Sequence, residues 1–171
     1  MIAEMTERSH IMEFKEIPVA IPSDANIILG QTHFIKTVED IYEAMVGISS
    51  AVKFGIAFCE ASGPCLIRTE GNDPELVKMA EKAASDIACG HTFIIYLRNG
   101  FPINFLPRLK MTPEVCHIIC ATANPLTVIV AENKQGRGVM GVIDGFPPKG
   151  IEGSEDKQKR HKFLRDIGYK R

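Results

Sequence analysis

Residues 115–144 read VCHIICATANPLTVIVAENKQGRGVMGVID, and this stretch decides the fold. It contains three short apolar runs that are rich in Val and Ile and too short for typical helices, so strands are predicted. These runs span residues 115–121, 126–132 and 139–144. Pro125 closes the first break, because proline keeps the preceding residue out of the helical region. Gly136-Arg137-Gly138 forms the second break as a tight turn. The stretch predicts a three-stranded β-meander in the C-terminal half.

Working outward, further strand-like runs alternate with three helical patterns. Residues 14–21 predict a strand, and Pro18 places it at a sheet edge. Thr37, Asp73 and Ser154 are each expected to cap the start of a helix. Gly90 is expected to end the second helix in the left-handed conformation, and the third is expected to run to Ile167. The overall prediction is an α+β fold, a mixed β-sheet with the meander and about three helices on one or both faces.

Two details of these elements bear on packing. Residues 99–113 contain three prolines and predict an irregular segment with at most one helical turn. The last helix is highly charged, so we expect it to pack only through Phe163, Leu164 and Ile167.

Length and composition are typical of one globular domain. The chain has 171 residues, of which 45% are apolar, so we expect a single domain at 12–171 after a leader or expression scar at 1–11. A net charge of −1 gives no general attraction to nucleic acid, and no apolar run approaches the ~18 residues of a membrane span. The odd number of five cysteines and the lack of a signal peptide predict reduced thiols in the cytoplasm.

Phosphate chemistry would need an unusual site in this chain. The sequence has no Gly-Lys-Ser or Gly-Lys-Thr loop, no GxGxxG and no protein-kinase signature. Gly136-Arg137-Gly138 offers backbone N–H groups pointing outward beside a guanidinium, which suits an anion, although a plain hairpin turn with an exposed Arg has the same pattern. His33 and His91 lie at the edges of predicted elements, where side chains reach ligands. From the residues alone, hydrogen-bonded structural histidines are the more frequent case.

Two other groups have competing interpretations. Phe101-Pro102-Ile103-Asn104 could hold a purine by stacking and hydrogen bonding, or it could be a packed loop. Cys116 and Cys120 would lie roughly 13 Å apart on one strand, too far for a single ion. We therefore interpret them as buried thiols and expect no metal site.

Eight segments of the chain form a set in a fixed order. They are residues 30–40 (GQTHFIKTVED), 58–63 (FCEASG), 71–73 (GND), 90–91 (GH), 101–104 (FPIN), 113–116 (PEVC), 120–125 (CATANP) and 135–138 (QGRG). Together they resemble a family, the small archaeal and bacterial adenosine-specific kinases. The resemblance implies binding of adenosine or AMP rather than ADP or ATP, a phosphorylated histidine and a homotrimer. It implies no established turnover reaction. The sequence departs from the family at Pro107, where a polar residue in a short helix is expected.

On this resemblance we assign candidate roles. The catalytic candidates are His91, which we prefer as the phosphorylated residue, His33, Lys36 and Arg137. The ligand-binding candidates are Phe101, Asn104, Asn124, Gly136, Gly138 and Glu60. We expect no cofactor, no nucleic-acid partner and no membrane partner. Three hypotheses follow: phosphotransfer through a histidine, a non-catalytic adenosine/AMP-binding or sensing module, and a structural oligomer without a small ligand.

Overall fold

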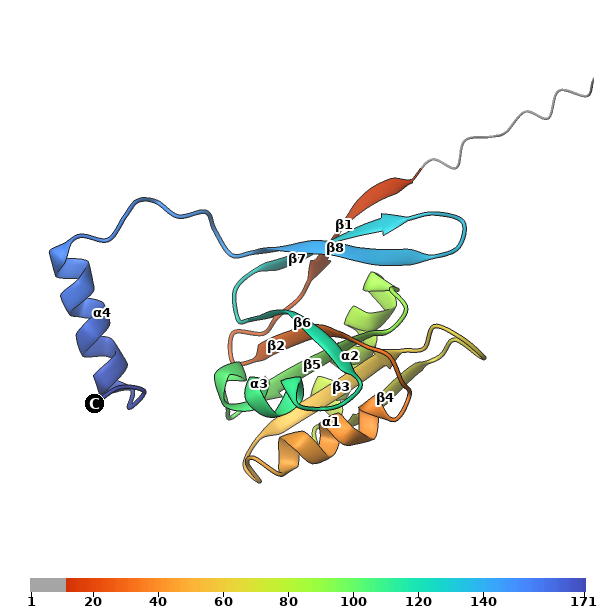
Figure 1. Ribbon diagram of the computed structural model, residues 1–171, viewed down its shortest axis with the longest axis horizontal. Helices are drawn as coiled ribbons and strands as arrows, with labels where there is room; N and C mark the ends of the chain where they lie inside the picture. Colours follow the sequence, from red (N-terminus) through yellow and green to blue (C-terminus); the bar gives the residue numbers. More distant parts are fainter. Residues whose placement is uncertain (1–11) are drawn as a thin grey trace, which may run out of the picture.

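The computed structural model describes residues 12–171, which form eight strands and four helices (Figure 1). In chain order they are β1 (Glu13–Val19), β2 (Asn26–Thr32), α1 (Thr37–Val46), β3 (Lys53–Cys59), β4 (Ile67–Gly71), α2 (Pro74–Ile87), β5 (Thr92–Arg98), α3 (Pro102–Lys110), β6 (Val115–Thr122), β7 (Leu126–Glu132), β8 (Arg137–Asp144) and α4 (Ser154–Asp166). The α+β class is confirmed. The expected leader, residues 1–11, lies outside the described residues.

The strands form two sheets, ordered β4-β3-β5-β2-β6 and β1-β7-β8. All neighbouring strands in both sheets are antiparallel, so the expectation of a mixed sheet is wrong. The β3–β4 hairpin reverses the chain before α2, and β5 therefore returns antiparallel to β3. Strand β5 then separates β2 from β3, which would otherwise be a parallel pair. It is buried along nearly its whole length because it is the central strand.

The predicted meander is half correct. Strands β6, β7 and β8 form where expected, and β7 and β8 make a hairpin, but β6 pairs with β2 in the other sheet. Strand β7 has β1 and β8 on its two edges, so no edge remains for β6. The break at Pro125 is therefore a crossing between sheets. The position of Pro18 on an edge strand is confirmed, since β1 ends the three-stranded sheet.

The residues that cap the helices agree with the sequence-based predictions only in part. Asp73 caps α2 as predicted, accepting hydrogen bonds from the N–H groups of Glu75 and Leu76. Lys36 rather than Thr37 precedes α1, because the Thr37 hydroxyl bonds back to the Phe34 carbonyl. Helix α2 ends at Ile87 and is capped by Ala88, whose φ of 52° takes the left-handed role expected of Gly90.

Later in the chain, two further expectations are wrong. Gly153, not Ser154, caps α4, and its N–H donates to the Asp156 carboxylate. Residues 102–110 form the nine-residue helix α3 rather than an irregular segment. Pro102 suits its first position, and Pro107 removes one helical hydrogen bond, while burial of Phe105 and Leu109 anchors the helix.

The core has two layers, one on each face of the five-stranded sheet. On one face, α1 and α3 pack over Phe54, Phe93 and Ile95. On the other face, α2 and the inner side of the three-stranded sheet enclose apolar side chains that include Ile94 and Tyr96. Helix α4 joins neither layer and has no buried residue, so its predicted packing through Phe163, Leu164 and Ile167 is wrong within one copy. Figure 1 shows it held away from both sheets by an extended connection.

Candidate functional site

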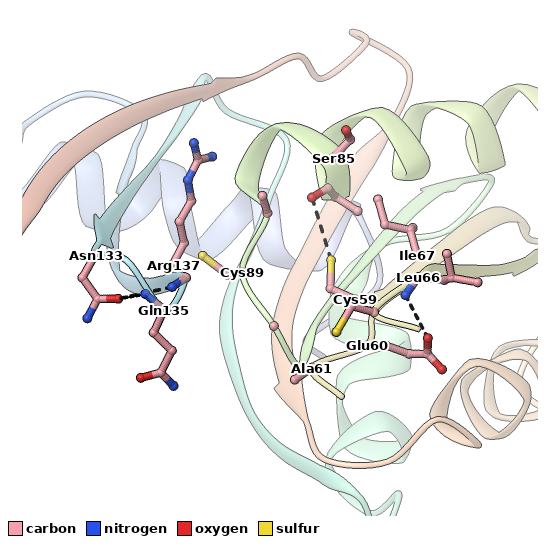
Figure 2. Close-up of a pocket in the computed structure, with 15 residues that line it drawn as sticks. Cys59, Glu60, Ala61, Leu66, Ile67, Ser85, Cys89, Asn133, Gln135 and Arg137 are labelled. Carbon is pink, nitrogen blue, oxygen red and sulfur yellow. Dashed lines mark hydrogen bonds between the residues drawn. The ribbon is translucent and has the colours of Figure 1, made fainter. Parts of the chain in front are cut away.

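A cavity of about 690 Å³ opens where the C-terminal end of α2 meets the β7–β8 hairpin and the β3–β4 loop (Figure 2). This volume is in the range of small-molecule sites. Its lining residues are Cys59, Glu60, Ala61, Cys65, Leu66, Ile67, Ala84, Ser85, Ala88, Cys89, Gly90, Asn133, Gln135, Gly136 and Arg137. The structure therefore brings together three predicted site residues, Glu60, Gly136 and Arg137, with the neighbour of a fourth, His91.

Arg137 is the cationic residue of this lining. Its Nε donates to the Glu132 carboxylate at 2.7 Å, and one terminal nitrogen donates to the Asp86 carbonyl in the last turn of α2 at 3.1 Å. The C-terminal end of a helix carries partial negative charge, so this contact offsets the field that disfavours an anion there. Two of the five N–H donors of the guanidinium are thus engaged, and no other partner of this group occurs within residues 12–171.

The turn before Arg137 differs from the predicted anion site. The N–H groups of Gln135 and Gly136 donate to Asn133 Oδ1 at 2.8 and 3.2 Å, so they do not point outward. Sequence reasoning missed Asn133, although an Asn followed by a Gly three residues later is a recognisable turn signal. Gly136 and Gly138 remain predicted ligand contacts because the space beside both Cα atoms is open.

Glu60 fixes the opposite wall. One of its oxygens accepts from the Leu66 N–H and the other from Arg68, each at 2.8 Å. The hydrogen bond from Arg68, followed by that from Leu66, lowers the pKa of the Glu60 carboxyl. Glu60 is therefore an ionised anchor of the β3–β4 loop, and its predicted contact with a ligand remains a prediction.

His91 lies at the start of β5, directly after the cavity residue Gly90. Its N–H donates to the Cys59 carbonyl at 2.8 Å, and its carbonyl accepts from the Thr32 N–H at 2.9 Å. The backbone is held in the left-handed region with φ of 61°, and the imidazole stacks on Phe58 with ring centroids 6.1 Å apart. Both main-chain bonds and the stacking fix this half-buried imidazole between β2 and β3.

His33 and Lys36 lie at the same end of the five-stranded sheet, since Thr32 bonds to His91. The His33 side chain is exposed, while its N–H donates to the Glu114 carbonyl. Lys36 forms ion pairs with Asp40 and with Glu114, at 2.8 Å from the latter. Glu114 is only 3% exposed, so Lys36 compensates a buried carboxylate. Arg137 is therefore the stronger candidate for a phosphate group.

Phe101, Asn104 and Asn124 lie at the other end of that sheet. Seven residues of β5 separate Phe101 from His91, a span of roughly 23 Å. Asn124 follows β6, whose end pairs beside the start of β2. Asn104 accepts hydrogen bonds from the Phe101 N–H and the Tyr169 hydroxyl, and Asn124 donates to Asp144. Within one copy, a single small ligand cannot touch both groups.

The cysteines at the cavity are not the pair that the sequence pattern emphasised. Cys116 and Cys120 are on β6 as predicted, although Cys116 is exposed, and no metal-binding cluster occurs within residues 12–171. The cavity instead contains Cys59, Cys65 and Cys89. All five cysteines are free thiols. Their convergence depends on the pairing of distant strands, which no spacing in the sequence reveals.

Thiol reactivity should separate these cysteines by pH. Burial raises the pKa of Cys89 and that of Cys120 to about 11, and the thiolate is the reactive form. At pH 8, iodoacetamide should therefore modify the exposed Cys65 and Cys116 first and leave Cys89 and Cys120 intact until the pH approaches 11. Because their thiols are neutral in the fold, the stability that they contribute is present below about pH 9 and lost between pH 9 and 11. Peptide mapping of the alkylated protein measures this, with Cys65→Ser as the control.

No helix within residues 12–171 is long and apolar enough to cross a membrane.

Comparison with known proteins identifies the family of this chain. No curated protein matches the chain. The crystal structure of the PH1918 protein from Pyrococcus horikoshii OT3 is similar, with a TM-score of 0.90 and 41% identity over 94% of this chain and 99% of that one. The family model described as adenosine-specific kinase matches residues 17–170. The chain belongs to the adenosine-specific kinase family.

Proposed function

We propose that the cavity binds adenosine and AMP, and that His91 beside it accepts or donates the phosphoryl group. The family supports an adenosine-related function. The observation that carries the proposal is Arg137, which offers free guanidinium donors in a nucleoside-sized cavity whose lining reaches Gly90. Arg137 would bind the phosphate oxygens and neutralise charge that develops during transfer.

In the transfer to adenosine, the P–N bond of phosphorylated His91 breaks and a P–O bond forms to the 5′ oxygen, whose proton passes to the released imidazole nitrogen. The reverse transfer would make a high-energy P–N bond from a low-energy phosphate ester, so AMP alone does not load the histidine. Neutral imidazole is a competent nucleophile. The backbone contacts of His91 and its stacking on Phe58 hold the ring in a fixed orientation, which lowers the entropic cost of transfer. His33 is the alternative phosphorylation site, on a more exposed segment.

A non-catalytic adenosine/AMP-binding or sensing module is the second candidate. Lys36 is engaged by two carboxylates, and the Gln135 and Gly136 N–H groups are engaged by Asn133. One arginine with few other donors suits a monophosphate better than a triphosphate, which needs several cations. This supports the preference for AMP over ATP in either hypothesis.

We also propose that the protein works as a homotrimer in the cytoplasm, without nucleic-acid or membrane partners. Phe101, Asn104 and Asn124 are too far from His91 to share its ligand within one copy. A neighbouring copy could place them at the site, so their predicted contacts with adenosine require assembly.

Calorimetric titration and intact mass test the proposal together. Adenosine and AMP should bind, with ATP weaker by roughly tenfold or more. AMP should also slow alkylation of Cys65, which lines the cavity. Purified protein should carry one acid-labile phosphoryl group by intact mass, and adenosine should remove this group with formation of AMP. Binding without this mass change would select the non-catalytic module, and absence of both would reject the proposal.

His91→Asn and His33→Asn form a matched pair for locating the phosphate. Asparagine tolerates the left-handed backbone at position 91, so the fold is kept. The His91→Asn protein should lose the phosphoryl group, and the His33→Asn protein should keep it. Peptide mapping under alkaline conditions reads this out, and the opposite pattern would transfer the role to His33.

A further inference from the structure

Residues 145–171, the C-terminal arm, form few contacts with the rest of their own copy. Figure 1 shows the arm leaving β8 and carrying α4 away from both sheets. Phe146, Ile151 and Phe163 are 81%, 99% and 58% exposed. Beyond the root at Gly145, one hydrogen bond joins the arm to the rest of residues 12–171, from the Tyr169 hydroxyl to Asn104 at 3.5 Å. A 13-residue helix without packing is marginally stable in water. The arm therefore needs a surface that its own copy does not provide.

The direction of the arm is built into its root. Asp144 accepts hydrogen bonds from the Thr122 hydroxyl at 2.7 Å and from the Asn124 amide at 3.0 Å. The Gly145 N–H donates to the Pro125 carbonyl at 2.9 Å, and its φ of 67° suits glycine. Pro147-Pro148 then stiffens the connection. These features aim the arm outward and oppose its folding back onto β8.

Charge favours a second copy as the partner. The arm has eight Lys or Arg against four Asp or Glu, a net charge of +4. Residues 12–144 have 11 against 15, a net charge of −4. The arm of one copy is therefore attracted to the body of another.

An apolar sheet face is available to receive the arm. The inner side of the three-stranded sheet is covered by the core, through Val128 and Val130. The outer sheet face, which we define by Phe14, Ile129, Met140 and Ile143, points away from it. Phe14, Met140 and Ile143 are 67%, 61% and 53% exposed. Glu16, opposite Ile129, lies on the same face, so exposed apolar side chains and one acidic group are gathered where a basic, partly apolar arm could bind.

We propose that the C-terminal arm of one copy packs on the outer sheet face of another, with Phe163, Leu164 and Ile167 of α4 against the sheet. Each copy gives an arm to one neighbour and receives one from another, so the contact is heterologous and can close a ring. The proposal does not depend on the ligand, because no cavity residue takes part.

Matched variants of the full chain test the exchange by sedimentation velocity. Phe163→Asp disables the arm, and Ile143→Asp disables the outer sheet face. Gln158→Asp places the same charge on the opposite side of α4 and is the control. Phe163→Asp and Ile143→Asp should each sediment as a single 18.9 kDa chain, whereas the wild type and Gln158→Asp should associate. Both substituted side chains are more than half exposed, so the fold should persist, as circular dichroism would check.

Mixing the two disabled variants distinguishes exchange from other modes of association. The Ile143→Asp copy has an intact arm and the Phe163→Asp copy has an intact sheet face, so an equimolar mixture should associate although neither variant does alone. If Ile143→Asp fails to fold, Met140→Glu replaces it on the same face. A wild-type protein that sediments as a single chain, disabled variants that still associate, or a mixture that stays dissociated would each overturn the proposal.

Discussion

Gly55→Ala should lower the free energy of unfolding by about 3 kcal/mol, within the range of severe overpacking. Gly55 lies on β3 where the start of α2 crosses the sheet. An added Cβ would lie 2.1 Å from the Val77 nitrogen and 2.2 Å from the Leu76 carbonyl carbon. Both are backbone atoms of a helix, so rotation of a side chain cannot relieve the overlap. Helix α2 would have to move away from β3, and the buried contacts of Leu76 and Ala80 would loosen with it.

Urea unfolding of the variant beside Gly138→Ala measures this effect. A Cβ at Gly138 meets nothing within 4 Å, so the control changes the same chemical group in open space. Its unfolding midpoint should stay close to that of the wild type. Equal midpoints for the two variants would show that α2 does not approach β3 as closely as described.

Arg137→Ala should weaken AMP binding by roughly tenfold or more and change adenosine binding little. A hydrogen bond to a charged group contributes about 1.5–3 kcal/mol, and adenosine has no phosphate to receive it. Calorimetry with both ligands gives the ratio of affinities. Lys134→Ala removes the same charge from an exposed site on the same hairpin and should leave that ratio unchanged. Equal losses for AMP and adenosine in Arg137→Ala would reject the assignment of the phosphate site.

Local signals in the sequence predicted local structure well. The Val- and Ile-rich runs became strands, Asp73-Pro74 began a helix, and Pro18 lay on an edge strand. Each of these depends on a few neighbouring residues. The pairing of β6 with β2 was not predictable in this way, because the partner lies about ninety residues earlier and the nearest strand, β7, is taken by β1.

Two local rules were overridden by packing. Pro107 argued against a helix at 102–110, yet burial of Phe105 and Leu109 outweighs the missing hydrogen bond. Ala88 adopts a left-handed conformation two residues before Gly90, because Cys89 and His91 must reach their partners on the hairpin and on β3. Both outcomes are set by distant residues.

The candidate site likewise combines features that the sequence predicted with features that depend on the fold. The sequence identified Arg137 and His91 as chemically suitable residues, and the fold places Arg137 in the lining of the cavity and His91 directly after the lining residue Gly90. It could not show that Asn133 occupies the N–H groups of the turn, or that Lys36 is committed to Glu114. It also grouped Phe101, Asn104 and Asn124 with residues at the opposite end of the sheet. The order of residues along the chain does not show how far apart they lie in the fold.

The pairing of β1 with β7 has a consequence for the growing chain. Glu13 pairs with Glu132, so the first strand must wait for more than a hundred further residues before its partner exists. Contacts of such separation form slowly, and exposed strands are prone to aggregate in the meantime. The five-stranded sheet needs residues only up to Thr122 and can form first. The wall of the cavity that contains Arg137 therefore forms at the end of synthesis, when the β7–β8 hairpin pairs with β1.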